Sequence, residues 1–306
     1  MELYFLGTSA GMPIRGRNVT SIALRVSQYN GSFWMFDCGE GTQHQLLHTS
    51  LKLSRLNKLF ITHLHGDHVY GLPGLLSSRS SLGGTDALHI YGPQGLHELL
   101  ETNLRLTETH LNYPLHIVEI NEGMLFEDDE VMVEAAKLDH RIDCFGYRIM
   151  EHERKGALNA SWLAEMGVPA GPAYGQLKAG NDITLEDGRV IRSADAVGKP
   201  LPGHIITILG DTRPCDNAVK LGEDADVLIH EATFAHDLAE KAYEYGHSTA
   251  LQAAEIAYAA KAKKLFITHF SSRYQLEDLA HLEMEARSIF SNTEAAIELR
   301  PYTILL

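Results

Sequence analysis

The sequence predicts a layered α+β fold in which two related β-sheets pack together beneath outer helices. Several short runs are rich in β-branched and aromatic residues, as strands buried on both faces are. Each of these runs is followed or closed by a polar residue, often Asp or His. Amphipathic stretches of helical length lie between some of these runs. The hexapeptide Lys-Leu-Phe-Ile-Thr-His occupies positions 58–63 and 264–269. Since each copy reads as a strand that ends at a histidine, the repeat favours two related halves with a site along one sheet edge.

The elements follow in order from these signals. The opening residues 1–7 carry an acid where a signal peptide would be basic, so they are predicted to form the first strand. Further strands are expected at residues 21–26, 33–37, 58–63, 131–138, 205–211, 227–230 and 264–269. Helices are expected at residues 95–106, 236–245, 251–261 and 279–290.

One stretch has a different composition. Ten of the fifty residues at 151–200 are Gly or Pro, and seven acids nearly balance six bases. Apolar periodicity is weak there except at 158–166. We therefore predict one domain over 1–306 with a protruding insertion at 151–197, and a floppy surface excursion is the alternative.

Composition limits the class of protein. Hydrophobic residues make up 44% of the 306 residues and charged ones 22%, which is ordinary for a globular chain. No run approaches the roughly 18–20 apolar residues of a membrane helix. The three cysteines, Cys38, Cys144 and Cys215, are odd in number and widely spaced, which argues against a disulfide framework. The expected location is the cytoplasm, without a membrane partner.

The net charge of −14 argues against a nucleic-acid partner, because phosphate contacts need basic surface. The distribution weakens this objection. Residues 1–80 hold seven Lys and Arg against four Asp and Glu. An acidic body with one basic edge would orient a polyanion, so charge alone does not decide the partner.

The strongest signal is the run Thr62-His63-Leu64-His65-Gly66-Asp67-His68 at a strand end. Imidazole and carboxylate suit Zn²⁺ and similar cations, and Gly66 permits a turn between two pairs of ligands. A chance histidine cluster on a solvated loop is the alternative. Four ligands cannot fill the coordination shells of two ions, so we expect the remaining ligands at other strand ends. The candidates are His140, Asp211 and His269, each of which alone could be a buried polar residue.

Other histidines are weaker candidates. His44 and His48 lie four residues apart on an expected helix, a spacing that can bind metal but more often marks a helix face.

With these residues in place, the pattern His63-x-His65-x-Asp67-His68, His140, Asp211 and His269 resembles the signature of the metallo-β-lactamase superfamily. That resemblance implies an αββα sandwich with a dinuclear site at one edge. It assigns one metal to His63, His65, His140 and Asp211, and the other to Asp67, His68, Asp211 and His269. Asp37, in Phe36-Asp37-Cys38-Gly39, matches the superfamily's first motif and would support the ligands.

Further stretches resemble the ribonuclease Z family. They are Phe5-Leu6-Gly7-Thr8-Ser9-Ala10-Gly11, Pro13-Ile14-Arg15-Gly16-Arg17-Asn18, His230-Glu231-Ala232-Thr233, His247-Ser248-Thr249, 156–160 and Gly171-Pro172. Length and motif order resemble the short form, close to the enterobacterial ribonuclease BN. The resemblance implies removal of the 3′ trailer from precursor tRNA, leaving a 3′-hydroxyl, with possible 3′ exonuclease trimming. Arg15 stands where the family has Lys, which leaves the treatment of an existing CCA end open.

The same resemblance suggests roles and partners. Asp67 would orient or deprotonate the attacking water, and His247, oriented by Glu231, would protonate the leaving oxygen. Two Zn²⁺ per chain are expected, with Co²⁺ or Mn²⁺ as possible substitutes, and the chain is expected to be a homodimer. Precursor tRNA would contact Arg15, Arg17, Asn18, Arg273, Gly171 and Pro172.

Two other function classes stay open. One is a small-molecule metallohydrolase, such as a lactonase or thioesterase, and the other is a non-catalytic RNA-binding or scaffold protein on the same fold. The insertion and the motifs at 230–233 and 247–249 argue against the first, and the complete ligand set argues against the second.

Overall fold

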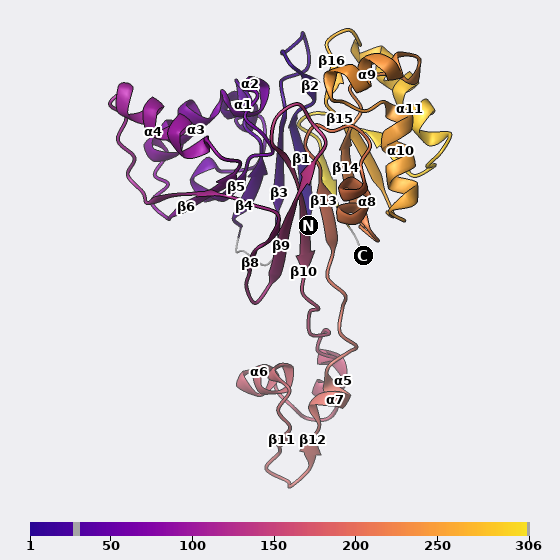
Figure 1. Cartoon of the computed structure of the whole chain (residues 1–306). Coiled ribbons are helices and arrows are strands. Elements are labelled where there is room, and N and C mark those ends of the chain that lie inside the picture. The colour runs from indigo at the N-terminus through magenta and orange to yellow at the C-terminus, as the bar shows by residue number, and fades with distance from the viewer. Residues whose placement is uncertain (27–30, 305–306) are drawn as a thin grey trace. The chain divides into compact units, whose positions relative to one another are not determined.

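The computed structural model describes residues 1–26 and 31–304. Within them, two seven-stranded sheets form the centre of the larger unit (Figure 1). The first sheet has the order β18-β1-β3-β4-β5-β6-β7, and the second has the order β17-β15-β14-β13-β10-β9-β8. The bounds of the first set are β1 Glu2–Gly7, β3 Ser21–Arg25, β4 Phe33–Phe36, β5 Leu56–Phe60, β6 Leu88–Gly92, β7 Leu115–Glu119 and β18 Pro301–Thr303. Those of the second are β8 Gly123–Glu127, β9 Val131–Leu138, β10 Cys144–Glu151, β13 Ile205–Ile208, β14 Val227–Glu231, β15 Leu265–Thr268 and β17 Thr293–Ala295.

Helices cover the outer face of each sheet. The first sheet carries α1 Thr42–Leu46, α2 Gly66–Val69, α3 Leu72–Ser81 and α4 Leu96–Leu106, and the second carries α8 Asp216–Gly222, α9 Ala239–Tyr245, α10 Ala250–Ala259 and α11 Leu279–Arg287. Short 3₁₀ turns stand at Leu53–Arg55, His236–Leu238 and Leu276–Asp278, and a small pair joins β2 Ser9–Ala10 to β16 Phe270–Ser271. Strands β4 to β7 run parallel, as do β13, β14, β15 and β17, so helical crossovers are needed between them.

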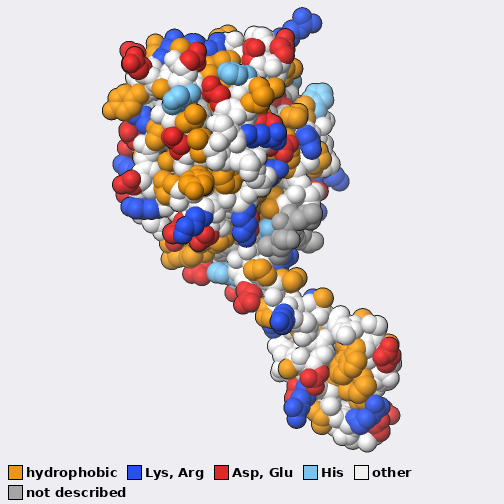
Figure 2. Space-filling view, turned by 90° about the vertical axis from the view of Figure 1, so that its right-hand side faces the viewer, with side chains coloured by type: hydrophobic (Ala, Val, Ile, Leu, Met, Phe, Trp, Pro, Cys, Tyr) orange, Lys and Arg blue, Asp and Glu red, His pale blue; other side chains and the backbone are white. Residues whose placement is uncertain are grey.

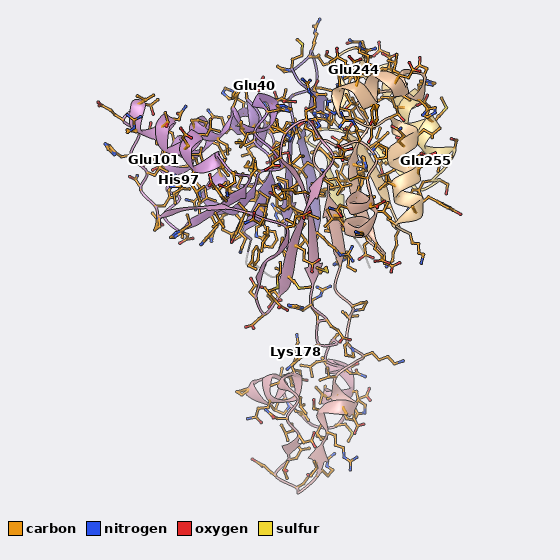
Figure 3. All side chains as sticks on the ribbon, in the orientation of Figure 1. Glu40, His97, Glu101, Lys178, Glu244 and Glu255 are labelled. Atoms are coloured by element: carbon orange, nitrogen blue, oxygen red, sulfur yellow. The ribbon has the colours of Figure 1, made fainter. Side chains whose placement is uncertain are left out.

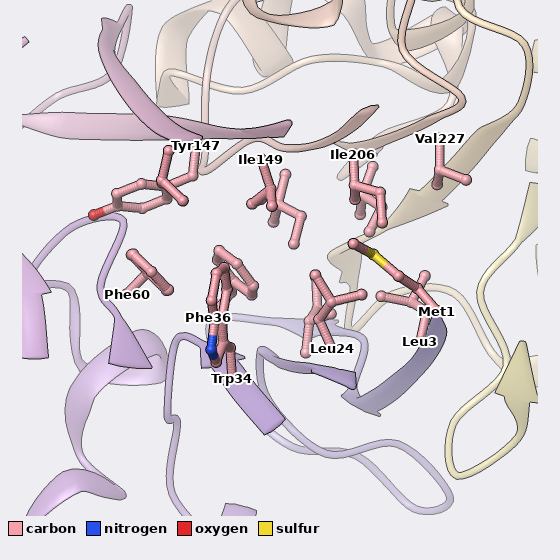
Figure 4. Packing of buried hydrophobic residues seen from close by; sticks show 14 of the residues in the cluster. Met1, Leu3, Leu24, Trp34, Phe36, Phe60, Tyr147, Ile149, Ile206 and Val227 are labelled. Carbon is pink, nitrogen blue, oxygen red and sulfur yellow. The ribbon is translucent and has the colours of Figure 1, made fainter. Parts of the chain in front are cut away.

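Alternation along the strands divides the core into layers. In β4, Trp34 and Phe36 pack between the sheets, whereas Phe33 and Met35 face the outer helices. Figure 4 shows the layer between the sheets, where Trp34, Phe36 and Phe60 of the first sheet face residues of the second such as Tyr147 and Ile149. A third cluster lies between the second sheet and its helices. The predicted αββα sandwich of two sheets and flanking helices is confirmed.

The strand predictions are accurate at their centres and less so at their ends. The strand at 131–138 has the predicted bounds, and the two hexapeptide copies fall in β5 and β15, one in each sheet. However, β5 ends at Phe60, whereas the predicted strand extended to His63. Ile61, Thr62 and His63 follow the strand at the edge of the sheet. The helix predicted at 236–245 starts as a 3₁₀ turn before α9, and the one predicted to reach 290 ends at Arg287.

Residues Met150–His204 form a second compact unit. It contains α5 Ala160–Glu165, α6 Pro172–Ala179, α7 Ser193–Ala196 and a hairpin of β11 Ile183–Thr184 with β12 Val190–Ile191. Its own apolar cluster includes Leu163, Val168 and Leu177, which are all fully or almost fully buried. The insertion predicted at 151–197 lies inside this unit. A packed cluster of this kind argues against a floppy excursion.

Three further findings concern the surface, the cysteines and the helices. Figure 2 shows one face of the molecule, on which Lys and Arg side chains are interspersed with Asp and Glu instead of forming one large basic patch. Cys38, Cys144 and Cys215 are free thiols, as predicted. Of the helices in residues 1–26 and 31–304, none combines the length and the apolar character that a bilayer crossing requires.

Candidate metal centre

The predicted ligands converge at one edge of the two sheets. His63 follows β5, His140 follows β9, Asp211 follows β13 and His269 follows β15. Because neighbouring parallel strands end at the same edge of a sheet, residues far apart in sequence meet there. The structure groups seven of the ligand candidates into sets whose donor atoms lie within 4.8 Å of one another.

The first set is His63, His65, His140 and Asp211. His65 Nδ1 lies 3.0 Å from His63 Nε2 and 3.2 Å from His140 Nε2. One Asp211 oxygen lies 3.6 Å from His63 Nε2. Three imidazole nitrogens and one carboxylate oxygen therefore lie close together, and this donor set is compatible with a divalent cation such as Zn²⁺.

The second set is Asp67, His68 and His269, and Asp211 joins it to the first. Asp67 Oδ2 lies 3.5 Å from His68 Nε2 and 3.4 Å from His269 Nε2. The Oδ2 atom of Asp211 is 3.6 Å from His68 Nε2, and its Oδ1 atom is 3.4 Å from His269 Nε2. Asp211 is thus placed between the two sets, as a bridging carboxylate would be.

Hydrogen bonding on the far side of each ring tests whether these residues fit a cation. His140 Nδ1 donates to the carbonyl oxygen of Gly246 at 2.7 Å, so its Nε2 carries a lone pair. His68 Nδ1 donates in the same way to Asp37 Oδ2 at 2.7 Å. Two bare nitrogens, His68 Nε2 and His269 Nε2, then face each other at 3.3 Å. Two lone pairs at that distance repel unless a proton or a metal ion lies between them, and the donor set is compatible with a metal ion.

Two buried carboxylates, one at a strand end in each sheet, fix the histidine tautomers. Asp37 accepts from the backbone N–H of Thr62 at 2.7 Å and from its hydroxyl at 2.8 Å. Because that hydroxyl proton points at Asp37, Thr62 Oγ1 accepts from His63 Nδ1 at 3.0 Å. Asp37 thereby orients both His63 and His68, which supports the expectation that it holds the ligands in place.

Glu231 has the same part in the second sheet. Thr233 donates its hydroxyl to Glu231 Oε2 at 2.6 Å and therefore accepts from His269 Nδ1 at 3.0 Å. The other Glu231 oxygen accepts from the backbone N–H of Thr212 at 3.1 Å and from His247 Nδ1 at 2.9 Å. The carboxylate thus orients one ligand candidate and the predicted proton donor together.

Two residues of the site have a strained backbone. Asp37 has a φ of 59° and His269 a φ of 57°, both in the left-handed region that non-glycine residues seldom adopt. Such conformations cost on the order of 1–3 kcal/mol each. They persist here because the hydrogen bonds of both side chains fix them.

Three of the ligand candidates have a lowered pKa, whereas a fourth does not. Burial, together with the neighbouring imidazoles, lowers the pKa of His63, and burial is also the main cause of the lowered pKa of His65 and His140. These rings are therefore neutral near pH 7, as metal ligands must be. Burial opposes the charged form of His68, but Asp211, Asp37 and Asp67 outweigh burial and raise its pKa.

His247 differs from the ligand candidates. Burial opposes its charged form, but Glu231 and Asp211 outweigh burial and raise the pKa of His247 to about 9. Its Nδ1 is occupied by Glu231, so Nε2 is the atom that can deliver a proton. The arrangement suits a general acid beside the two donor sets. His247 also falls in a set with Asp211 and His269 that could hold a metal. We favour the acid role because Glu231 stabilises the protonated ring.

The predicted substrate residues fall into two groups. Arg15 and Arg273 are exposed, and the guanidinium of Arg273 lies 5.2 Å from the Phe234 ring centroid. Arg17, in contrast, is only 3% exposed and donates to the backbone carbonyls of Ser271 and Tyr274 at 3.3 and 2.7 Å. Asn18 is similarly engaged, because its side chain donates to the carbonyl of Glu40. These contacts favour an internal role for Arg17 and Asn18 in fixing the loop that carries Arg15.

The remaining candidates lie elsewhere. Gly171 and Pro172 are exposed at the start of α6 in the second unit. His44 lies on α1, but that helix ends at Leu46, so His48 falls outside it. Among the described residues, the metal-compatible sets contain neither of these histidines.

Sequence reasoning missed three residues that support the site. Thr62 and Thr233 relay the two buried carboxylates to histidines, and Gly246 supplies the carbonyl for His140. A signal existed for each: Thr62 lies in the repeated hexapeptide, Thr233 ends the His-Glu-Ala-Thr stretch, and Gly246 closes α9 with a φ of 83°. A side chain at Gly246 would approach His140 Nδ1 to 2.9 Å, so only glycine fits both demands.

Comparison with known proteins agrees with this geometry. The chain is 53% identical over 305 residues to "Ribonuclease Z" of Bacillus cereus strain B4264, with 99% of each chain covered. It shows the same identity and coverage with "Ribonuclease Z" of Bacillus thuringiensis strain Al Hakam. The chain belongs to the ribonuclease Z family.

Solved structures extend the comparison. The crystal structure of human tRNase Z, short form, matches with a TM-score of 0.74 and 32% identity and covers 100% of both chains. The metallo-β-lactamase-fold protein YhfI from Bacillus subtilis has a TM-score of 0.68 at 18% identity, with 98% of both chains covered, and shows the shared fold only. Residues 1–149 also match the family described as anti-Pycsar protein Apyc1.

Proposed function

We propose that this protein is a metal-dependent endoribonuclease that removes the 3′ trailer from precursor tRNA and leaves a 3′-hydroxyl on the tRNA. The observation that carries the proposal is the pairing of two donor sets on Asp211 with the Glu231–His247 pair, whose nearest atoms are 2.9 Å apart. The substrate class is supported by the ribonuclease Z relatives at 53% identity and by human tRNase Z at 32%.

The seven residues of the first two donor sets would hold a pair of divalent cations, for which we propose Zn²⁺, with Co²⁺ or Mn²⁺ as substitutes. Two such ions supply charge neutralisation for a phosphodiester and activation of a water molecule. With two divalent cations bound, the carboxylates of Asp67 and Asp211 would leave the site with a net positive charge that attracts phosphate.

We propose that Asp67 orients the attacking water. Its Oδ2 accepts from the backbone N–H of Gly11 at 2.7 Å, which fixes the carboxylate while leaving it at the mouth of the site. We assign it the orientation or deprotonation of the water whose oxygen attacks phosphorus.

His247 then delivers a proton to the leaving oxygen. Attack by water breaks the bond between phosphorus and O3′ of the last retained nucleotide. The proton from His247 Nε2 makes that oxygen a 3′-hydroxyl, and the trailer keeps the phosphate. Glu231, hydrogen-bonded to Nδ1, stabilises the protonated ring before transfer.

Substrate contacts complete the proposal. Arg15 and Arg273 are exposed cations and would bind phosphates of the tRNA 3′ end. The second unit, with Gly171 and Pro172 exposed, would bind the tRNA body, and its near-neutral charge implies recognition of shape and backbone. We further propose that the protein is cytoplasmic and forms a homodimer. Light scattering of the purified protein would test the dimer.

The deciding experiment is incubation with precursor tRNA carrying a 3′ trailer, with and without CCA, followed by mapping of both ends. The proposal expects one cut, a 3′-hydroxyl on the tRNA and a 5′-phosphate on the trailer, and loss of both after chelation. Progressive shortening of the tRNA end would add exonuclease trimming. Turnover of lactones or thioesters without any cleavage of RNA would establish the small-molecule hydrolase instead.

A further inference from the structure

A groove beside the metal centre is not used by the residues assigned so far. It has a volume of about 660 Å³ and lies between the turn that carries the ligands and helix α4. Leu64, which separates two ligand candidates, and Tyr70 form one wall, and Leu99, Asn103 and Leu106 of α4 belong to the other. No Lys or Arg lines the groove. Its lining therefore suits nucleobases better than phosphates.

Tyr70 is the prominent feature of this groove. Its side chain is 70% exposed, which is unusual for a large aromatic residue without a partner surface. The ring lies against the backbone of Gly66, because a Cβ there would come within 2.1 Å of it. Gly66 is the residue between His65 and Asp67. The ring is thus held directly beside the reacting centre, and continues the site outward.

The groove and the proton donor lie on different sides of the metal centre. Around Asp211 the imidazole rings are in contact in a closed circuit of six, in the order His63, His65, His140, His247, His269 and His68. His140 lies between His63 and His247, with ring centroids 5.0 Å from the first and 5.2 Å from the second. The residue after His63 is Leu64 of the groove wall. Figure 1 shows the same division, with α2 and α4 on one side of β2 and with α9 and β16 on the other.

The chemistry of the proposed cleavage assigns the two sides. The oxygen that His247 protonates becomes the 3′-hydroxyl of the tRNA, so the tRNA end lies on the His247 side. Arg273 belongs to that side as well, because it stacks on Phe234, whose ring centroid is 6.2 Å from that of His247. The nucleotides beyond the scissile phosphate must leave in the other direction, toward Tyr70.

We propose that Tyr70 and the groove along α4 form a subsite for the first nucleobases of the trailer, with Tyr70 stacking on the base next to the scissile phosphate. This inference rests on the proposed function. From Leu99 to Leu106 the helix rises by about 10 Å, which is room for two or three stacked bases. Leu106, 68% exposed, would contact the outermost of them. Stacking is indifferent to base identity, so the subsite would accept trailers of any sequence.

The test uses the metal-loaded full-length enzyme with Tyr70→Ala and Tyr70→Phe variants. Substrates are precursor tRNAs whose first trailer nucleotides are normal or abasic. We expect Tyr70→Ala to lower kcat/KM on the normal trailer by on the order of 10- to 100-fold. Tyr70→Phe should retain most activity, because the ring provides the contact. On the abasic trailer, wild type and Tyr70→Ala should become nearly equal.

Controls separate stacking from damage to the ligand turn. Metal content should be unchanged in Tyr70→Ala, because Tyr70 contributes no donor atom to the metal-compatible sets. His97→Ala and Glu101→Ala provide matched surface changes, since these residues lie on α4 away from the groove and pair with each other at 3.5 Å (Figure 3). Leu106→Ala should weaken cleavage only when the trailer has several nucleotides.

The outcomes are distinct. If wild type fails to cut any precursor tRNA, the proposed function is wrong. If wild type cuts normally but Tyr70→Ala loses equally on normal and abasic trailers, or loses nothing, the trailer subsite is wrong. A change in oligomeric state of Tyr70→Ala without any trailer dependence would also overturn it, and would assign the groove to a second copy of the chain.

Discussion

Replacing Asp37 by Asn tests whether buried hydrogen bonds set the tautomers of the ligands. The substitution keeps the shape of the side chain, and Asn tolerates the left-handed backbone at φ 59° almost as well as Asp does. Alanine would add backbone strain to the loss of hydrogen bonds. Any effect of Asp37→Asn therefore reports the change from carboxylate to amide.

The size of the effect follows from the three donors that Asp37 accepts. If the new amide NH₂ faces His68 Nδ1 and the Thr62 hydroxyl, His68 must move its proton to Nε2, the atom that faces the second donor set. If the NH₂ turns the other way, it meets the backbone N–H of Thr62, which costs about 1–3 kcal/mol of unfolding free energy. The first outcome weakens metal binding about 10- to 100-fold, equivalent to about 1.4–2.7 kcal/mol.

Equilibrium dialysis against graded free Zn²⁺, with metal counted by mass spectrometry, measures the first effect, and chemical denaturation of the metal-free protein measures the second. Asp143→Asn is the matched control, because Asp143 is exposed and only pairs with Lys137 at 3.0 Å. We expect one of the two losses in Asp37→Asn and neither in the control. Wild-type metal affinity combined with wild-type stability would refute the reasoning.

Four further predictions follow from the site. Since Glu231 helps to hold the pKa of His247 at about 9, His247 loses its proton only above that pH. Glu231→Gln should therefore shift the alkaline fall of kcat, measured at saturating metal, to lower pH. An unshifted pH profile would contradict the acid role. His247→Ala should keep full metal content but lose at least about 100-fold in single-turnover rate, whereas lost metal would mark a structural role. Arg17→Met should raise KM for precursor tRNA while bis(p-nitrophenyl)phosphate is still hydrolysed, with the surface change Arg25→Met as control. Deleting the second unit should raise KM for precursor tRNA alone, and equal loss on both substrates would exclude a pure binding role.

The sequence brings the ligand candidates together because most of them stand at strand ends. Histidines that close buried strands of two sheets must appear at one edge, and the local run at 63–68 adds a turn that only short-range geometry controls. Polar residues at such ends have few alternatives to facing the site. The ligand candidates His140, Asp211 and His269 therefore converge as expected.

What the sequence could not show depends on contacts between distant loops. Arg17 appears in a motif beside Arg15, and nothing in the spacing distinguishes a buried arginine from an exposed one. Only the packing of its loop against residues 271–274 places one guanidinium on backbone carbonyls. The groove beside Tyr70 is invisible for the same reason, since α4 is distant in sequence from the turn that it faces.

The two sheets contribute ligands to the same small volume, and this has a consequence for folding. His63 and His269 are 206 positions apart in the sequence. Two bound metal ions would connect them as a covalent cross-link connects the ends of a long loop. An ion that binds only the folded chain adds about 2.7 kcal/mol to the free energy of unfolding when its free concentration is one hundred times its dissociation constant. Zinc supply would then govern how long each molecule survives proteolysis as well as how fast it works.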